Sequence, residues 1–413
     1  NKVVAVFLAS IIAFSSLRYE VFFIRSSAMM PISAVLIAVL LRHFYERPLF
    51  RHYFYYTVVL FLTLFLGSAA CLLQAILFSV AFFLALACYQ FSQKKTEKLS
   101  RFTKNFIFLN SASGLSLFIL GGWVFYSVFL EQQMVGYLRD PDYSADTIFA
   151  SPSLLFVFNQ IFKFMHAGFI SPWSGILGVQ QSIGGHSWNN VSALFPFFLL
   201  VAMFWKSRNF WEFSTKFLVL GFFLYMELCI WVPGFAGLIQ SVFNLYPPIK
   251  MHPFIMVFEV LMIGFFIERW GINKESIGLK VLKVSRAAVF ILSTLYAALL
   301  LFASLSMVAP KSLNSLLQIM LNGLNPFIGS EIKATFLANL ISENVNLFNE
   351  TMGLSHILFY GTTLVFLVLL GTKRWPQLIS WNKGSLFALA LLANAIFLSW
   401  AVYPLNKEPL IWD

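Results

Sequence analysis

Two carboxylic acids stand inside long apolar stretches of this 413-residue sequence. Glu227 lies in MELCIW and Glu259 in VFEVLM, on consecutive stretches that contain no Lys or Arg. A charged side chain at the centre of a bilayer costs at least about 2.5–3.5 kcal/mol, so such acids are usually paired, protonated or functional. Two interpretations stay open. The acids serve a proton-coupled transporter, or they form a structural polar patch between neighbouring helices.

A second group of candidates is basic and lies in NLYPPIKMHPF, residues 244–254. Paired prolines lead into a helix that we expect to start near Phe254, with Lys250 and His252 just ahead of it. Free N–H groups and the positive end of the helix dipole favour anions there, so this is a candidate seat for a phosphate or pyrophosphate. The alternative is a proline at a helix start beside a lysine that reaches for the membrane surface.

A third group belongs to a segment rich in Gly, Ser and Trp, GFISPWSGILGVQQSIGGHSWNN. His186 and Trp188 suit contact with a sugar or a lipid headgroup, because an indole stacks on C–H surfaces while its edge donates a hydrogen bond. An aromatic belt at the membrane interface, which needs no ligand, explains the same residues.

Metal and hydrolase chemistry has weaker support. Residues 131–152 contain Glu131, Asp140, Asp142 and Asp146, which could bind a divalent cation or supply a base, but they also suit a solvated acidic loop. No H-E-x-x-H or G-x-S-x-G occurs, and the three cysteines all lie in apolar runs, so no metal site is assigned and the catalytic residues stay unknown.

Composition indicates which elements must position these residues. The chain is 59% apolar and 11% charged, whereas soluble domains carry about 25% charged residues. A bilayer-spanning helix needs about 20 mostly apolar residues. We therefore predict an all-α polytopic membrane protein with about eleven spans: Val3–Leu17, Ala28–Leu41, Phe54–Leu66, Ala70–Phe91, Phe106–Leu130, Val191–Trp205, Phe217–Val232, Phe254–Ile267, Ala287–Val308, Leu354–Leu370 and Leu386–Val402.

The net charge of +11 reports the topology of these spans. Twenty of the 28 Lys and Arg, against five acids, fall at Lys2 and in loops 42–53, 92–105, 206–216, 268–286 and 371–384. Short loops rich in Lys and Arg are cytoplasmic, so we expect a cytoplasmic N-terminus and an outer C-terminus. The dispersed charges form no patch with interleaved aromatic residues, and nucleic-acid binding is therefore not expected.

The predicted organisation is one multispanning domain, 1–413, whose function faces outward. Its long outer segments include 131–190, with an interfacial helix over 153–166, and 309–353.

The order of features also resembles a known family. The relevant segments are ASGLSLFILGGWVFYSVFLEQQ (112–133), GHSWNNVSALFPFFLLVAMF (185–204), NLYPPIKMHPFIMVFEVLMIGFFIERWG (244–271) and LFALALLANAIFLSWAVYPLNKEP (386–409). Together they resemble the YfhO-like bacterial membrane proteins, within the GT-C superfamily of polyprenyl-phosphate-dependent glycosyltransferases. The resemblance implies a GT-C-like fold in the bacterial inner membrane and sugar transfer from a lipid-linked donor on the outer face, with Lys250 as a donor-phosphate contact.

One part of the family pattern is missing. GT-C enzymes carry an Asp or Glu in the first outer loop, where this sequence has LRYEVFFIRSS, residues 17–27, with Glu20 alone. Either the family's N-terminal spans are lacking, or the chain is a non-catalytic relative. Three hypotheses follow: a cell-envelope glycosyltransferase, a transporter or flippase of a lipid-linked glycan, and a membrane scaffold within a larger complex. The expected partners are membrane lipids and a polyprenyl-phosphate sugar.

Overall fold

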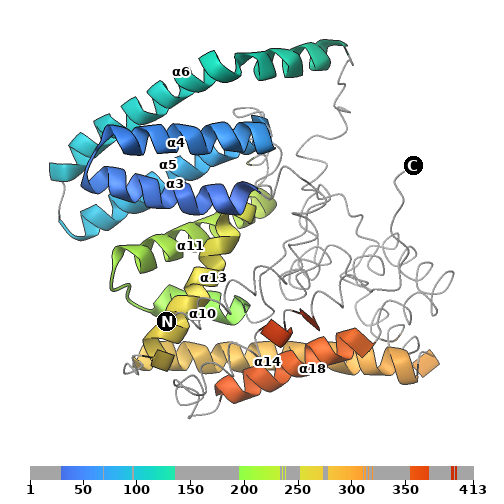
Figure 1. Cartoon of the computed structure of the whole chain (residues 1–413). Coiled ribbons are helices and arrows are strands. Elements are labelled where there is room, and N and C mark those ends of the chain that lie inside the picture. Colours follow the sequence, from blue (N-terminus) through green and yellow to red (C-terminus); the bar gives the residue numbers. More distant parts are fainter. Residues whose placement is uncertain are drawn as a thin grey trace. The chain divides into compact units, whose positions relative to one another are not determined.

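A computed structural model places the following residues: 29–134 except 68 and 95–96, 195–272 except 233–234, 236–237 and 239–251, 278–319 except 310, 313–314 and 316–318, 354–371, and 392–397 except 395. Every regular element in these ranges is a helix (Figure 1). The all-α class predicted from the sequence is therefore confirmed for the part of the chain that the structure describes.

The helices belong to two compact units. One unit, here called unit 2, contains α3 (Met29–Glu46), α4 (Phe50–Leu62), η2 (Thr63–Gly67), α5 (Ala69–Ser92), α6 (Glu97–Met134) and α11 (Phe210–Trp231). The other, unit 1, contains α10 (Phe195–Phe204), η4 (Ile267–Ile272), α14 (Leu279–Val308) and α18 (Leu354–Gly371). Helix α13 (His252–Phe266) begins in unit 2 and ends in unit 1. The single domain expected from the sequence stays a prediction.

Among the residues that the structure describes, three helices are long and apolar enough to cross a bilayer: Cys71–Ser92, Leu99–Trp123 and Leu279–Leu305. They overlap predicted spans and support the membrane class. Helices also occupy the other predicted spans between Ala28 and Leu370, but α10 has only 10 described residues. Val3–Leu17 lies outside the described residues, as does Leu386–Val402 apart from positions 392–397. The total of eleven spans stays a prediction.

The charged flanks of three predicted spans are partly helical, whereas the sequence predicts loops there. Helix α6 begins at Glu97, α11 at Phe210 and α14 at Leu279. Helix α6 also continues to Met134, so the outer segment 131–190 starts as helix, and its expected interfacial helix lies outside the described residues. The physical reason is that hydropathy reports the thickness of the hydrocarbon, whereas a helix continues into water as long as its backbone stays hydrogen-bonded.

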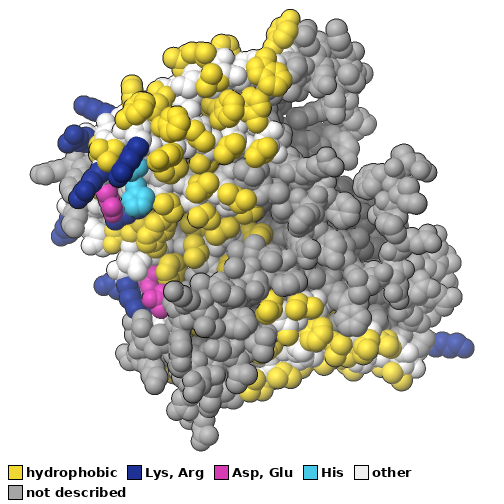
Figure 2. Space-filling view, in the orientation of Figure 1, with side chains coloured by type: hydrophobic (Ala, Val, Ile, Leu, Met, Phe, Trp, Pro, Cys, Tyr) yellow, Lys and Arg dark blue, Asp and Glu magenta, His cyan; other side chains and the backbone are white. Residues whose placement is uncertain are grey.

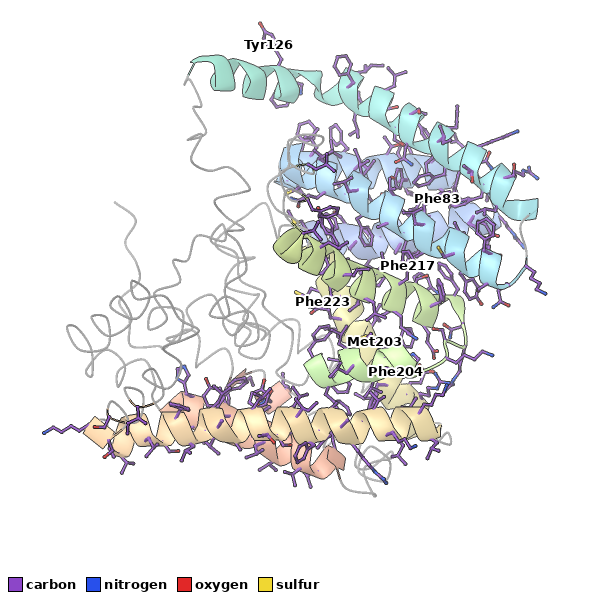
Figure 3. All side chains as sticks on the ribbon, turned by 180° about the vertical axis from the view of Figure 1, so that it is seen from behind. Phe83, Tyr126, Met203, Phe204, Phe217 and Phe223 are labelled. Carbon is purple, nitrogen blue, oxygen red and sulfur yellow. The ribbon has the colours of Figure 1, made fainter. Side chains whose placement is uncertain are left out.

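Helix α6 of unit 2 exposes a mainly apolar surface. On α6, Phe108, Phe118 and Ile119 are each 68–71% exposed, and the labelled Tyr126 points away from the neighbouring helices (Figure 3). Soluble monomers rarely expose apolar patches this continuous, whereas lipid tails cover them at no cost. The opposite side of α6 packs inward, where Phe106 stacks on Phe83 of α5 with ring centroids 4.5 Å apart.

Polar side chains join the helices of unit 2 internally. The Tyr56 hydroxyl of α4 lies 2.9 Å from both the Ser79 hydroxyl of α5 and the Asn110 side-chain oxygen of α6. Beside it, the Thr57 and Ser113 hydroxyls are 2.8 Å apart, again between α4 and α6. Such contacts specify which helix faces pair in an environment where apolar side chains alone discriminate poorly.

Unit 1 has a similar arrangement on a smaller scale. The Asn394 amide donates hydrogen bonds to the hydroxyls of Thr362 and Thr363 on α18, at 3.2 and 2.8 Å. The α14 side chain Tyr296 is completely buried and forms ring contacts with Phe359 and Tyr360 of the same helix α18.

All described Lys and Arg of unit 2 lie in three predicted cytoplasmic loops. They are Arg42, Arg47, Arg51, Lys94, Arg101, Lys104, Arg208 and Lys216, with Lys98 described as backbone only. Figure 2 shows basic side chains gathered at one end of this unit. We call it the basic end, and its sequence-distant loops meet in the pocket described below.

Removal of the Tyr56 hydroxyl should weaken unit 2. We expect Tyr56→Phe to lower the free energy of unfolding by about 1 kcal/mol, because the buried Ser79 hydroxyl of α5 and the half-buried Asn110 side chain of α6 lose this partner. Thermal denaturation of the purified protein in detergent measures this. The control is Tyr55→Phe, one position away and 53% exposed, which should leave the melting temperature unchanged. Equal melting temperatures for the two variants would contradict the assignment.

Candidate functional site

The candidate residues proposed on the outer face are mostly outside the described part of the chain. This holds for Lys250, His186 and Trp188. His252 is the first residue of α13 and Glu227 lies in α11, but their side chains are not among those described. Whether these residues come together stays a prediction.

Glu259 is the candidate whose side chain the structure does place. It is completely buried, in the helix HPFIMVFEVLMIGFF, and the preceding Phe258 contacts the Phe78 ring of α5 at 5.6 Å. The role of this buried acid, in transport or in a structural polar patch, stays a prediction. Whether it shares a polar patch with Glu227 stays a prediction.

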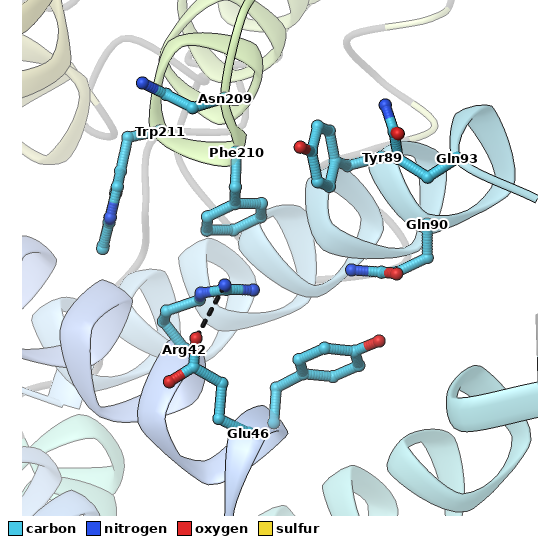
Figure 4. A pocket seen from close by; sticks show the side chains of 9 residues that line it. Arg42, Glu46, Tyr89, Gln90, Gln93, Asn209, Phe210 and Trp211 are labelled. Carbon is cyan, nitrogen blue, oxygen red and sulfur yellow. Dashed lines mark ion pairs between the residues drawn. The ribbon is translucent and has the colours of Figure 1, made fainter. Parts of the chain in front are cut away.

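The described residues also form a pocket that the sequence did not indicate. It lies within unit 2 at the basic end and has a volume of about 520 Å³. Three separate parts of the chain line it: Arg42, Tyr45 and Glu46 at the end of α3, Tyr89, Gln90 and Gln93 at the end of α5, and Asn209, Phe210 and Trp211 at the start of α11 (Figure 4).

Arg42 is held from two directions. Its guanidinium Nη2 lies 2.7 Å from Glu46 Oε1, one helical turn along α3, and its Cζ lies 4.6 Å from the centre of the Phe210 ring. The carboxylate neutralises the charge, and the ring covers the face of the guanidinium. The ion pair with Glu46 and the Phe210 ring together fix the position of the Arg42 side chain in the pocket lining.

The start of α11 is fixed by its own cap. Asn209 Oδ1 accepts a hydrogen bond from the Glu212 N–H at 2.9 Å, and Glu212 Oε2 accepts one from the Arg208 N–H at 2.8 Å. This arrangement closely follows a capping box, in which side chains satisfy the free N–H groups of the first helical turn. It sets the position at which Phe210 and Trp211 enter the pocket wall.

Tyr45 closes the side of the pocket next to α6. Its ring meets the Phe102 ring edge-on at 4.8 Å, and its hydroxyl is buried without a hydrogen-bond partner among the described residues. Burial raises the pKa of this hydroxyl above its ordinary value of 10.0, an effect that the nearby Arg42 charge partly opposes. The hydroxyl therefore stays protonated at neutral pH and is able to donate.

Gln90 supplies an amide to the same space. Its side chain is 6% exposed, and Figure 4 shows the amide directed across the pocket towards Arg42. No hydrogen bond joins this amide to another residue in the part of the chain that the structure describes. An amide offers two donor hydrogens and an acceptor oxygen, so a bound molecule with both capacities would satisfy it.

This set of groups suits binding rather than catalysis. The lining has one carboxylate, which is already paired, and no nucleophile beside a base. Among the described residues, no group of three or more His, Cys, Asp or Glu side chains could hold a metal ion. The acidic residues 140–146, which the sequence offers as ligands for a divalent cation, lie outside the described ranges.

Sequence reasoning missed the pocket for an identifiable reason. The charge pattern predicts on which side of the membrane these loops lie and carries no information on the aromatic and amide residues beside them. The available signal was the recurrence of aromatic and amide residues, YQFSQ at 89–93 and NFW at 209–211, in or beside two predicted cytoplasmic loops.

Comparison with known proteins adds no relative: no family model, curated protein or solved structure matches the chain.

Loss of the α11 cap should destabilise the pocket wall. We expect Asn209→Ala to lower the free energy of unfolding by about 1 kcal/mol, because the Glu212 N–H loses its acceptor. Asn209→Asp keeps a capping oxygen and should retain full stability. Thermal denaturation in detergent compares the two variants, and equal losses for both would show that the cap is not what stabilises this helix start.

Proposed function

We propose that this chain is a polytopic protein of the bacterial inner membrane that acts on a lipid-linked glycan. In this proposal it transfers a sugar, in the manner of GT-C enzymes, from a polyprenyl-phosphate donor to an acceptor at the outer leaflet or in the envelope. The class of protein rests on the three candidate spans and the apolar faces around them. The reaction rests on the family resemblance described above.

The observation that carries the donor site is the start of α13. The helix begins at His252, with Pro253 as its second residue, close to the Phe254 start expected from the sequence. A proline in the first turn does not disturb a helix, since the first N–H groups have no intrahelical partner. The remaining N–H groups and the positive end of the dipole favour a phosphate, and Lys250 precedes them by two positions in the sequence.

The orientation we propose has the N-terminus in the cytoplasm and the C-terminus outside. It is supported by the meeting of three Lys- and Arg-rich segments at one end of unit 2, as the positive-inside rule requires of cytoplasmic loops. The start of α13 then belongs to the outer side, where the sugar transfer would occur.

Neutralisation of the basic residue should impair donor binding. We expect Lys250→Ala to raise the KM for the polyprenyl-phosphate sugar about tenfold, the loss expected when a charged contact to a phosphate is removed. Transfer of a radiolabelled sugar in proteoliposomes measures it. The matched control is Lys311→Ala, an exposed lysine of another predicted outer segment, which should leave the KM unchanged. Wild-type kinetics for Lys250→Ala would remove the donor site from the proposal.

Translocation of the lipid-linked glycan is the second candidate, and the burial of Glu259 favours it. A carboxyl that is completely inaccessible within an apolar helix is the kind of group that proton-coupled carriers protonate and deprotonate. Structural pairing with a neighbouring helix explains the same burial, and a substitution distinguishes the two.

The Glu259→Gln variant separates these roles because it keeps the shape of the side chain and can still form hydrogen bonds but cannot ionise. If Glu259 carries protons, transport of the lipid-linked glycan should lose its dependence on pH, while the protein keeps its melting temperature. A fluorescent glycolipid assay across a pH series measures this. An unchanged pH profile for the variant would reject proton coupling through Glu259.

A further inference from the structure

The pocket at the basic end has a surface chemistry that the proposed sugar transfer does not use. Its walls combine aromatic rings, amides and one ion pair, and the charges on its lining cancel, since Arg42 and Glu46 are its only ionised residues. Its volume of about 520 Å³ falls in the range of about 300–1,000 Å³ typical of small-molecule sites.

An anion is a poor occupant. The Arg42 guanidinium already pairs with Glu46 at 2.7 Å, and Phe210 covers its face. The Glu46 side chain is 48% exposed, so a bound phosphate would meet a carboxylate beside the only cation of the lining. The exposed Lys and Arg of the basic end lie outside the pocket and attract anions to the surface in general.

A hydrocarbon chain is also a poor occupant. It would enclose the amide of Gln90, which as a residue is only 6% exposed, without offering it a hydrogen bond. The amide has two donor hydrogens and an acceptor oxygen. The occupant must therefore present several groups that donate and accept in turn, which is the property of a polyol.

The aromatic residues fit the same type of molecule. Trp211 and Tyr89 belong to different walls, and both are half-buried, so each presents part of its ring system to the space. Ring faces favour the C–H surfaces of a sugar, while the indole N–H and the phenol hydroxyl bond to its hydroxyl groups.

We propose that this pocket binds an uncharged, hydroxyl-rich ring, a hexose or similar polyol, either free or as the headgroup of a lipid. The carrying observation is the buried Gln90 amide aimed into a charge-balanced pocket with aromatic walls. The site is assembled from α3, α5 and α11 and does not include Lys250 or His252, so it does not depend on the sugar-transfer proposal.

The test measures sugar binding to the purified full-length chain in nanodiscs, without maltoside or glucoside detergents, which would themselves occupy the site. The probes are methyl β-D-glucoside in solution, a glucosyl diacylglycerol in the nanodisc, and phosphatidylglycerol as the anionic comparison. Calorimetric titration gives the dissociation constants. We expect a glucose-bearing probe to bind and phosphatidylglycerol not to displace it.

Two variants assign binding to this pocket. Gln90→Leu and Trp211→Leu should each weaken binding by about tenfold or more, because one removes the central amide and the other a ring face. The matched control is Gln74→Leu, the same substitution at another buried position of α5 outside the pocket, which should bind as the wild type does. Melting temperatures of all three show whether a loss of binding reflects a loss of folding.

The outcomes separate the sources of the ligand and the failure of the proposal. Binding of glucosyl diacylglycerol but not of methyl glucoside identifies a lipid headgroup, and binding of both identifies the sugar itself as sufficient. Unchanged affinity in Gln90→Leu and Trp211→Leu, displacement by phosphatidylglycerol, or no binding of either sugar probe overturns the proposal. None of these results alters the Lys250→Ala kinetics, which test the outer-face reaction separately.

Discussion

The structure depends above all on the absence of water from the bilayer interior. A backbone there must satisfy its own N–H and C=O groups, and helices do so within a single segment. Charged side chains then move to the helix ends, and interior polar side chains must find partners on other helices. The Tyr56 hydroxyl between Ser79 and Asn110 meets that requirement, and the basic residues at one end of unit 2 show the same constraint acting on charge.

The pocket follows from this sorting of residues. Because arginine, amide and amphipathic aromatic side chains are all favoured where a helix leaves the hydrocarbon, the ends of α3, α5 and α11 supply them together. Arg42 would otherwise make this a cationic site. Glu46, one turn further along α3, cancels that charge, and the Phe210 ring is positioned over the guanidinium by the Asn209 cap. Specific contacts thus turn a generic interfacial composition into a neutral cavity.

Sequence reasoning located the elements better than their ends or their contacts. Helix α5, Ala69–Ser92, almost coincides with the predicted span Ala70–Phe91, because the whole helix is apolar. Helix α6 begins at Glu97 rather than Phe106, because its first turns are charged yet helical. The sequence could not predict the pocket, because Arg42 and Phe210 are far apart in the chain. Only packing brings the Arg42 Cζ to 4.6 Å from the centre of the Phe210 ring. Periodicity indicates which side of a helix is apolar and not which distant segment it meets.

The two proposed sites have opposite chemistry and, in the proposed orientation, belong to opposite sides of the membrane, so one lipid-linked sugar does not occupy both at once. A charged phosphate and an uncharged ring of hydroxyls need opposite environments. A phosphate is stabilised by free N–H groups and a cation, which the sequence places at the start of α13. A sugar ring is stabilised by amides and aromatic faces with no surplus charge, which the Gln90 pocket provides. A surplus cation in the pocket would favour abundant anionic lipids over sugars, so the Arg42–Glu46 pair is the feature on which its selectivity depends.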